Sequence, residues 1–259
     1  MIRKLGKACI SIAHGIGAVM FLAGDTFRSL NPVSIRWRLT LSQIAEIGIR
    51  SQPVVLVTGA FTGAVFAAQT YFQFAKVSME SAVGAVVAVA MCRELGPVLA
   101  GLMVAGRVGA AMSAEIGTMK VTEQIDALRS LGVHPIDYLV VPRVLAMLIS
   151  MPLLVGECIF IGIAASYYVS VNVMDISGTY YIAHMLTFTM ATDVFMGLIK
   201  ALVFGMIIVF VSCYMGLNAR EGAVGVGHAT TEAVVVSSLT LLIANFFLTM
   251  FLNIFFPVG

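Results

Sequence analysis

Two opposite charges stand side by side in an apolar stretch of the sequence. Residues 88–101 read AVAMCRELGPVLAG, so Arg93 and Glu94 directly precede a Gly-Pro pair. Successive residues of a helix point about 100° apart, so these two side chains cannot pair face to face. Because an ionised group in apolar surroundings is costly unless it is paired or hydrated, each must find a partner on another segment.

The composition places this stretch in a membrane. Hydrophobic residues make up 60% of the 259 positions and charged residues only 11%, against about 25% charged in soluble domains. Four scattered cysteines show neither a disulfide pattern nor metal-ligand spacing. A net charge of +2 gives no indication of nucleic-acid binding. We therefore predict an integral membrane protein without a metal or cofactor.

Five stretches are long and apolar enough to cross a bilayer, which takes about 20 residues of helix. They cover residues 53–75, 81–105, 144–171, 194–217 and 233–256. We expect an all-α fold, because lipid offers no hydrogen-bond partner to an unpaired backbone group. Residues 1–52 are too polar to cross and form a separate N-terminal region, while residues 53–259 form the five-helix domain.

The N-terminal region contains an amphipathic segment. Trp37, Leu41, Ile44 and Gly48 share one helical face. A helix of this kind lies along a membrane surface with its Trp at headgroup depth. We predict an interfacial helix here, with a plain soluble helix as the alternative.

Lysine and arginine are concentrated on one side of the predicted topology. They lie before the first span, between the second and third, and between the fourth and fifth, whereas Lys76 alone lies on the other side. Positive charge accumulates on the cytoplasmic side of membrane proteins. We predict a cytoplasmic N-terminus and a C-terminus on the outer side.

The paired charges lie deep in the second span. Counted at 1.5 Å per residue from Ser81, Arg93 is about 18 Å along it, near the middle of a core about 30 Å thick. We expect Glu94 to pair with Lys200 of the fourth span, and Arg93 to face a cavity that admits lipid headgroups, since a guanidinium donates two parallel bonds to phosphate. A closed network that only stabilises the bundle stays open as the alternative. Glu157 is expected to have a hydrogen-bonded structural role.

Three further patterns concern helix packing. Gly59 and Gly63 have the G-x-x-x-G spacing that lets two helices approach closely. Asn245, Thr249 and Asn253 recur on one face of the fifth span and predict hydrogen bonds between helices. The Gly-Pro pair removes a backbone hydrogen bond from the second span, allowing a kink whose freed carbonyl a neighbour can satisfy.

The connection between the second and third spans, residues 106–143, is the longest polar one. Val121, Ile125 and Leu128 predict a short amphipathic helix, with a stop at Gly132. This helix is either a docking surface for an energy-supplying partner or a simple linker. The sequence contains no G-x-x-x-x-G-K-[ST] phosphate-binding loop, so ATP-driven action requires a separate ATPase subunit.

Four motifs around this connection occur in order at short spacing: R-E-L-G-P, A-G-R-x-G, A-E-I-G-x-M and E-Q-I-D-A-L, between residues 93 and 128. In these motifs the sequence closely resembles the MlaE-type permeases, membrane subunits of ABC transporters that work with MCE-domain proteins. The resemblance extends from about residue 52 to the C-terminus. It implies five spanning helices after an N-terminal interfacial helix, with a cytoplasmic coupling helix between the second and third spans.

The resemblance also implies partners and a cargo. The implied partners are a second copy of the permease in a homodimer, a cytoplasmic ABC ATPase, a hexameric MCE-domain protein on the periplasmic face and a STAS-domain accessory protein. The implied cargo is phospholipid, moved between the inner and outer membranes to maintain outer-membrane lipid asymmetry. The implied location is the bacterial inner membrane.

Individual residues receive roles from the same resemblance. Gln69 and Tyr71, at the outer end of the first span, are expected to flank the lipid-entry pocket. Contacts with the ATPase are expected from Glu115, Met119, Glu123, Gln124, Asp126 and Leu128.

Two other classes of function stay open. An ion-coupled secondary transporter would use buried acids as a proton relay, although five spans do not form an even inverted repeat. A non-transporting membrane scaffold would need the same apolar bundle. An enzyme is not expected, because no nucleophile, base and orienting group recur in one plausible site.

Overall fold

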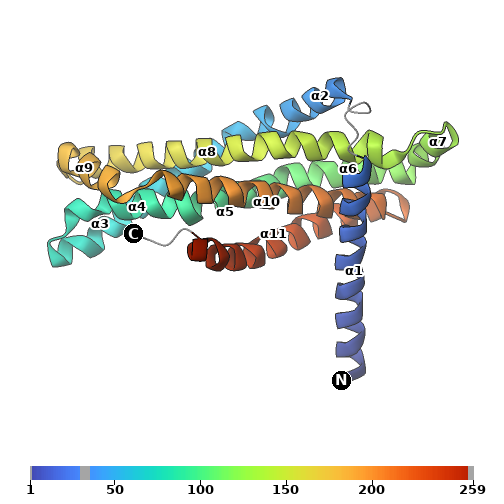
Figure 1. Ribbon diagram of the computed structural model, residues 1–259, viewed down its shortest axis with the longest axis horizontal. Coiled ribbons are helices and arrows are strands. Elements are labelled where there is room, and N and C mark those ends of the chain that lie inside the picture. Colours follow the sequence, from blue (N-terminus) through green and yellow to red (C-terminus); the bar gives the residue numbers. More distant parts are fainter. Residues whose placement is uncertain (1, 30–35, 256–259) are drawn as a thin grey trace.

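The protein is a bundle of long helices. Figure 1 shows its computed structural model, which describes residues 2–29 and 36–255. The described residues form helices and no strands. Five of their helical segments are long and apolar enough to span a membrane: Trp37–Val77, Glu80–Val121, Ile136–Asn172, Ala191–Leu217 and Gly222–Phe255. The predicted all-α fold with five spanning helices is confirmed.

Each of the first three segments combines several helical elements. The first contains α2 (Trp37–Ile47), η1 (Ile49–Ser51), α3 (Gln52–Phe74) and η2 (Ala75–Val77). The second contains η3 (Glu80–Ala82), α4 (Val83–Ala90), η4 (Met91–Leu95), α5 (Gly96–Val104), η5 (Ala105–Gly109) and α6 (Ala110–Val121). The third contains η6 (Ile136–Val140) and α8 (Val141–Asn172). The fourth and fifth are the single helices α10 (Ala191–Leu217) and α11 (Gly222–Phe255).

Three other helices mark the ends of the bundle. In Figure 1, α7 (Gln124–Ser130) lies at one end and α9 (Gly178–Phe188) at the opposite end. Helix α1 (Ile2–Ser29) crosses the long axis near the α7 end and points away from the bundle. It packs on α10, where the ring centroids of Phe27 and Phe210 lie 6.2 Å apart.

The stripe predicted around Trp37 is only partly free of the bundle, and the interfacial placement of its helix stays a prediction. Helix α2 continues into α3 and packs along α8. Trp37 and Leu41 are exposed, but Ile47 is buried and Gly48 lies against Ser150 of α8. Amphipathic spacing identifies an apolar side without saying whether lipid or another helix covers it. The helix that lies across the bundle axis is α1.

Helical structure extends far into the connection predicted at residues 106–143. Helix α6 continues to Val121 and η6 begins at Ile136, so only residues 122–135 connect the two segments. The predicted stripe is interrupted at Glu123, whose φ of +62° breaks the helix before α7. Gly132, with φ +73°, ends the loop helix as predicted. An apolar run indicates where a helix leaves the membrane, not where the helix itself ends.

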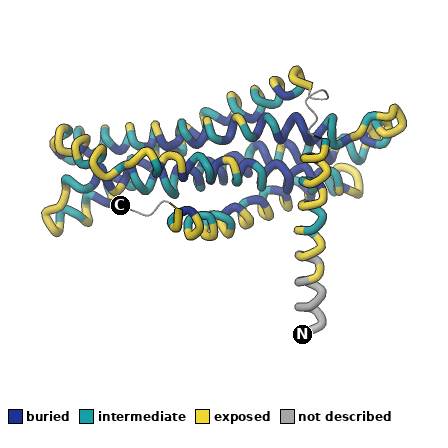
Figure 2. The backbone as a smooth tube through the Cα atoms, in the orientation of Figure 1, coloured by how far each residue is buried: buried dark blue, intermediate teal, exposed yellow. Residues whose placement is uncertain are grey.

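The buried residues form two clusters, and Figure 2 shows the dark core running along the inside of the bundle. The larger cluster includes Met147 of α8 with Phe204 and Ile208 of α10. A smaller one surrounds Tyr181 of α9, whose hydroxyl is hydrogen-bonded to Ser166 of α8. In contrast, α11 exposes most of its surface (Figure 2).

Candidate functional site

The predicted ion pair between Glu94 and Lys200 is present. The Lys200 Nζ lies 2.8 Å from the Glu94 Oε1, and the lysine side chain is fully buried. The same Nζ lies 2.7 Å from the carbonyl oxygen of Arg93 and 2.8 Å from the Thr249 hydroxyl. The ammonium group therefore has an acceptor for each of its three protons, which makes a buried charge tolerable.

The Gly-Pro pair explains why the Arg93 carbonyl is free to accept. Pro97 has no N–H to donate to the carbonyl four residues earlier, and the residues before the pair form the π-helical turn η4. Gly197 of α10 lets the two helices approach, since a Cβ there would lie 2.3 Å from the Cys92 carbonyl oxygen. Lys200, about one turn further along α10, satisfies the freed carbonyl. The prediction that a neighbour would do so is confirmed.

Arg93 does not face an open cavity, contrary to the prediction. Its Nε donates to the Asp193 Oδ1, and its Nη1 donates to the Asn253 Oδ1 at 3.2 Å. The side chains of Arg93 and Asp193 are only 13% and 2% exposed. Asp193 was missed because it directly precedes the apolar run of the fourth span and counts as loop by a span-length criterion. Its position seven residues before Lys200, two turns along the same face, was the signal that could have identified it.

The polar stripe of α11 supplies the other partners. The Asn245 Nδ2 donates to the Glu94 Oε2 at 3.0 Å, and the Thr249 hydroxyl lies 2.9 Å from the Glu94 Oε1. Asn253 accepts the bond from Arg93. The predicted hydrogen bonds between helices are confirmed, and they fix an otherwise exposed helix against the second and fourth segments.

These groups form one connected set, which we call the polar network: Arg93, Glu94, Asp193, Lys200, Asn245, Thr249 and Asn253. It joins η4, α10 and α11 in an apolar bundle. Its two carboxylates and two cations balance in formal charge. The structure thus has the closed arrangement that the sequence left open as an alternative, enlarged by one acid and three polar residues.

At the α7 end, two of the predicted partner contacts take part in ion pairs within the chain. The Glu115 Oε2 accepts a bond from the Nη2 of Arg143 at 2.8 Å. Asp126 accepts from Lys120 and from Arg129, both at 3.1 Å. These acids therefore hold α6, α7 and the start of α8 together, whatever else they contact.

The four remaining predicted contacts divide by exposure. Met119 and Leu128 pack against the main core. Glu123 and Gln124 are exposed at the turn that opens α7. The apolar stripe of the loop thus faces the bundle, and its polar side faces outward.

Sequence comparison supports a family assignment. The sequence matches the family described as Permease MlaE over residues 40–251. It is 46% identical to a "Probable ABC transporter permease protein" of Rickettsia felis, over 98% of this chain and 97% of that protein. The chain belongs to the MlaE permease family. It is also 44% identical to a probable ABC transporter permease protein of Synechocystis, over 90% of this chain and 88% of that one.

A plant protein is similar to this MlaE permease as well. "Protein TRIGALACTOSYLDIACYLGLYCEROL 1, chloroplastic" of Arabidopsis thaliana is 40% identical over 90% of this chain and 67% of that protein. The five apolar segments and these relatives identify the chain as a multi-pass membrane protein and a transporter permease.

The other predicted site residues of the permease lie away from the polar network. Gln69 is exposed on α3, and Tyr71 packs on the smaller cluster. Glu157 of α8 accepts a bond from the Gln52 Nε2 at 3.0 Å. The hydrogen-bonded structural role predicted for Glu157 agrees with this contact.

Replacing Asp193 with asparagine is expected to destabilise the permease by about 1–3 kcal/mol, because the amide leaves the buried Arg93 without a counter-charge. The measurement is unfolding by SDS titration of the purified protein. Asp175→Asn makes the same chemical change at an exposed position and serves as the control. Equal stability of the two variants would show that the Arg93–Asp193 contact contributes little.

Proposed function

We propose that this chain is the membrane subunit of an ATP-driven transporter that moves phospholipids between the inner and outer membranes and so maintains outer-membrane lipid asymmetry. The observation that carries the proposal is the MlaE family match over residues 40–251, in a chain without a phosphate-binding loop. Its relatives are named ABC transporter permeases, and the plant relative is named after a lipid, trigalactosyldiacylglycerol. ATP hydrolysis then belongs to a separate subunit.

The proposed assembly is a homodimer of this chain in the bacterial inner membrane, with a cytoplasmic ABC ATPase, a hexameric periplasmic MCE-domain protein and a STAS-domain accessory protein. The concentration of lysine and arginine at the α7 end supports a cytoplasmic N-terminus and a periplasmic C-terminus. The ATPase would bind at α7, where Glu123 and Gln124 are exposed. The MCE-domain protein would bind at the α9 end.

For the cargo, the headgroup is not placed at Arg93, because Asp193 and Asn253 already occupy the guanidinium. Gln69 and Tyr71 would flank the entry for the acyl chains at the outer end of α3. The mostly apolar bundle around one polar cluster matches an amphiphilic cargo.

The test is reconstitution. The chain, purified together with its companion subunits, is placed in donor vesicles that contain fluorescent phospholipid, and transfer to acceptor vesicles is measured with ATP and with a non-hydrolysable analogue. ATP-dependent transfer supports the proposal. Transfer that depends on a pH gradient and ignores ATP would favour an ion-coupled transporter, and a complex without any nucleotide-hydrolysing subunit would refute ATP drive.

Glu123→Lys is expected to weaken ATPase binding by about five- to tenfold, or to uncouple hydrolysis from transport, because it reverses an exposed charge at the proposed docking turn. Co-purified ATPase and ATP consumed per lipid transferred are the two measurements. Glu80→Lys reverses an exposed acid at the opposite end and is the control. If both variants retain wild-type binding and coupling, Glu123 has no role in docking.

A further inference from the structure

Helix α2 and the turn after it carry an apolar stripe that the bundle leaves uncovered. Trp37, Leu41 and Ile49 recur at multiples of four residues and are 61%, 62% and 63% exposed. Thr40 and Ile47, by contrast, are buried where α2 packs on α8. An exposed apolar patch of this kind marks contact with lipid or with another protein.

The stripe begins where two membrane-spanning segments start together. The segment Trp37–Val77 begins at Trp37, and the segment Ile136–Asn172 begins two residues before Tyr138. The guanidinium of Arg36 lies 4.9 Å from the centre of the Tyr138 ring and so joins the two starts. Figure 1 shows that α1 lies across the bundle at the level where α2 begins, and that α7 lies further out. This level is where a membrane surface meets the bundle.

Arginine side chains surround the stripe. Arg36 and Arg38 flank Trp37, and Arg50 directly follows Ile49. Arg107 of η5 reaches the same corner, because its Nη1 donates to the Ser51 Oγ at 2.7 Å. We call the stripe and its four arginines the α2 surface: Arg36, Trp37, Arg38, Leu41, Ile49, Arg50 and Arg107.

Acids balance this charge only in part. Glu46 lies 2.6 Å from Arg50 and 4.0 Å from Arg107. Asp137, next to Tyr138, lies 3.5 Å from the Nδ1 of His134. With both acids counted against the four arginines, an excess of two positive charges remains. Among the side chains that the structure describes, none forms an ion pair with Arg38, which is exposed.

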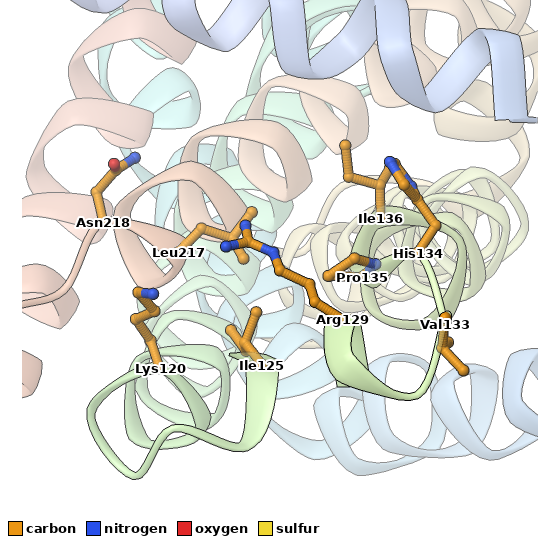
Figure 3. A pocket seen from close by; sticks show the side chains of 10 residues that line it. Lys120, Ile125, Arg129, Val133, His134, Pro135, Ile136, Leu217 and Asn218 are labelled. Atoms are coloured by element: carbon orange, nitrogen blue, oxygen red, sulfur yellow. The ribbon is translucent and has the colours of Figure 1, made fainter. Parts of the chain in front are cut away.

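The other basic pair near this end belongs to a different surface. Lys120 and Arg129 line a cavity between α7 and the end of α10, which Figure 3 shows. Both side chains pair with Asp126 at 3.1 Å. Arg129 therefore provides a control for the loss of one positive charge at this end of the molecule but away from α2.

We propose that the α2 surface binds anionic phospholipid headgroups in the leaflet nearer α7. Trp37 and Leu41 lie at the boundary of the acyl chains, while the Arg38 guanidinium donates to a headgroup phosphate. A protein partner could also cover an apolar stripe, but tryptophan and surplus arginine at the start of a span favour an anionic membrane surface. This lipid is a bound ligand that holds the first segment at a fixed depth, and it is separate from any transported lipid.

Trp37 is the single tryptophan of the chain, so its fluorescence reports directly on the α2 surface. The purified chain is reconstituted in vesicles of phosphatidylcholine and phosphatidylglycerol at one fixed ratio. A small, equal amount of brominated lipid, which quenches tryptophan on contact, replaces either the neutral or the anionic lipid. We expect brominated phosphatidylglycerol to quench Trp37 about fivefold more per mole than brominated phosphatidylcholine, and this preference to shrink at high salt.

Two substitutions identify the charge that is responsible. Arg38→Gln is expected to lower the preference to about twofold or less, because it removes the arginine that no carboxylate engages. Arg129→Gln removes the same charge beside the cavity and is expected to keep the wild-type preference. Trp37→Phe gives the background signal, and melting curves followed by circular dichroism verify that each variant is folded.

Equal quenching of the wild-type chain by the two lipids would show lipid contact without a preference for anionic headgroups and would overturn the proposal. Absence of quenching by either lipid would mean that α2 faces something other than lipid, which also overturns it. An equal loss of preference in Arg129→Gln would assign the effect to overall charge instead of the α2 surface. None of these outcomes bears on ATP-dependent transport, which the reconstitution described above tests separately.

Discussion

Glu94→Leu is expected to destabilise the bundle more than Lys200→Met, although both remove the same ion pair. Removing the acid leaves a fully buried cation without a counter-charge, whereas removing the cation leaves an acid that still accepts hydrogen bonds from Asn245 and Thr249. An unpaired charge in a fully buried position has no solvent or headgroup to turn to, and breaking such a pair costs about 3–5 kcal/mol. We expect Glu94→Leu to reach that range and Lys200→Met to cost about half as much.

A double-mutant cycle measures this coupling. The variant with both substitutions has no orphaned charge at this position, so it should recover much of the stability lost in Glu94→Leu. Free energies of unfolding come from SDS titration of the purified protein. The exposed pair of Arg50 and Glu46, 2.6 Å apart, is the matched control and should show a coupling below about 1 kcal/mol. Additive effects at Glu94 and Lys200 would show that the pair does not stabilise the bundle.

The sequence predicts those residues of the polar network that lie inside the predicted spans, and it misses the one that lies just outside them. The sequence predicts the ion pair between Glu94 and Lys200, because both are charged residues deep within apolar runs. It identifies the α11 stripe, because amides and hydroxyls recur at helical spacing. The sequence does not identify Asp193, because the apolar run of the fourth span is taken to begin directly after this acid. The depth of Asp193 in the bundle also depends on how far α10 is shifted along the neighbouring helices. That shift is set by tertiary contacts such as Gly197 on the Cys92 carbonyl.

The π-helical turns are a second feature beyond the reach of the sequence pattern. An apolar run with a proline predicts an interruption of the second span but not its kind. In the structure, the wider turn η4 directs Arg93 to Asp193 and Glu94 to Lys200, two partners two turns apart on α10. A π turn inserts one residue into the helical register and so changes the direction of the side chains after it.

The sequence predicts an amphipathic helix in the loop after α6, but it does not predict what the apolar side of that helix contacts. Its amphipathic spacing is real, since Ile125 is buried and Leu128 packs on the core. From spacing alone, such a stripe is equally suited to an external partner and to the chain's own bundle. The resemblance to the permeases placed the partner at this loop, but the arrangement of Lys120 and Arg129 around a cavity requires Gly132 and the end of α10, which lies about 90 residues later in the sequence.

Gly63→Ala is expected to destabilise the protein by about 3 kcal/mol or to prevent folding. Helix α3 approaches α8 so closely that a Cβ at this position would lie 2.1 Å from the carbonyl oxygen of Gly162. The predicted packing role of the G-x-x-x-G pair is confirmed, because Gly59 meets the backbone of Cys158 in the same interface. The added methyl must push the two helices apart along much of their length, and overpacking of a rigid contact is costly.

Gly156→Ala is the control, because it introduces the same methyl into α8 where a Cβ would meet nothing within 4 Å. Alanine is the better helix former by up to about 1 kcal/mol, so this variant is expected to be neutral or more stable in the same SDS titration. The two substitutions should therefore differ in sign. Wild-type stability of Gly63→Ala would show that α3 and α8 do not require this approach.

A substitution at a third glycine distinguishes a clash with the backbone from a clash with a side chain. At Gly101 the nearest obstacle to a Cβ is the Leu241 Cδ1 at 2.7 Å, the end of a side chain. Trimming Leu241 to alanine should therefore rescue Gly101→Ala in part, because the methyl then has room. No such rescue exists for Gly63→Ala, since its obstacle is the backbone of another glycine and nothing remains to be removed. A companion substitution on the facing side of α8 that restored Gly63→Ala would mean that α3 can shift without loss, and that the close approach is not what holds the two helices together.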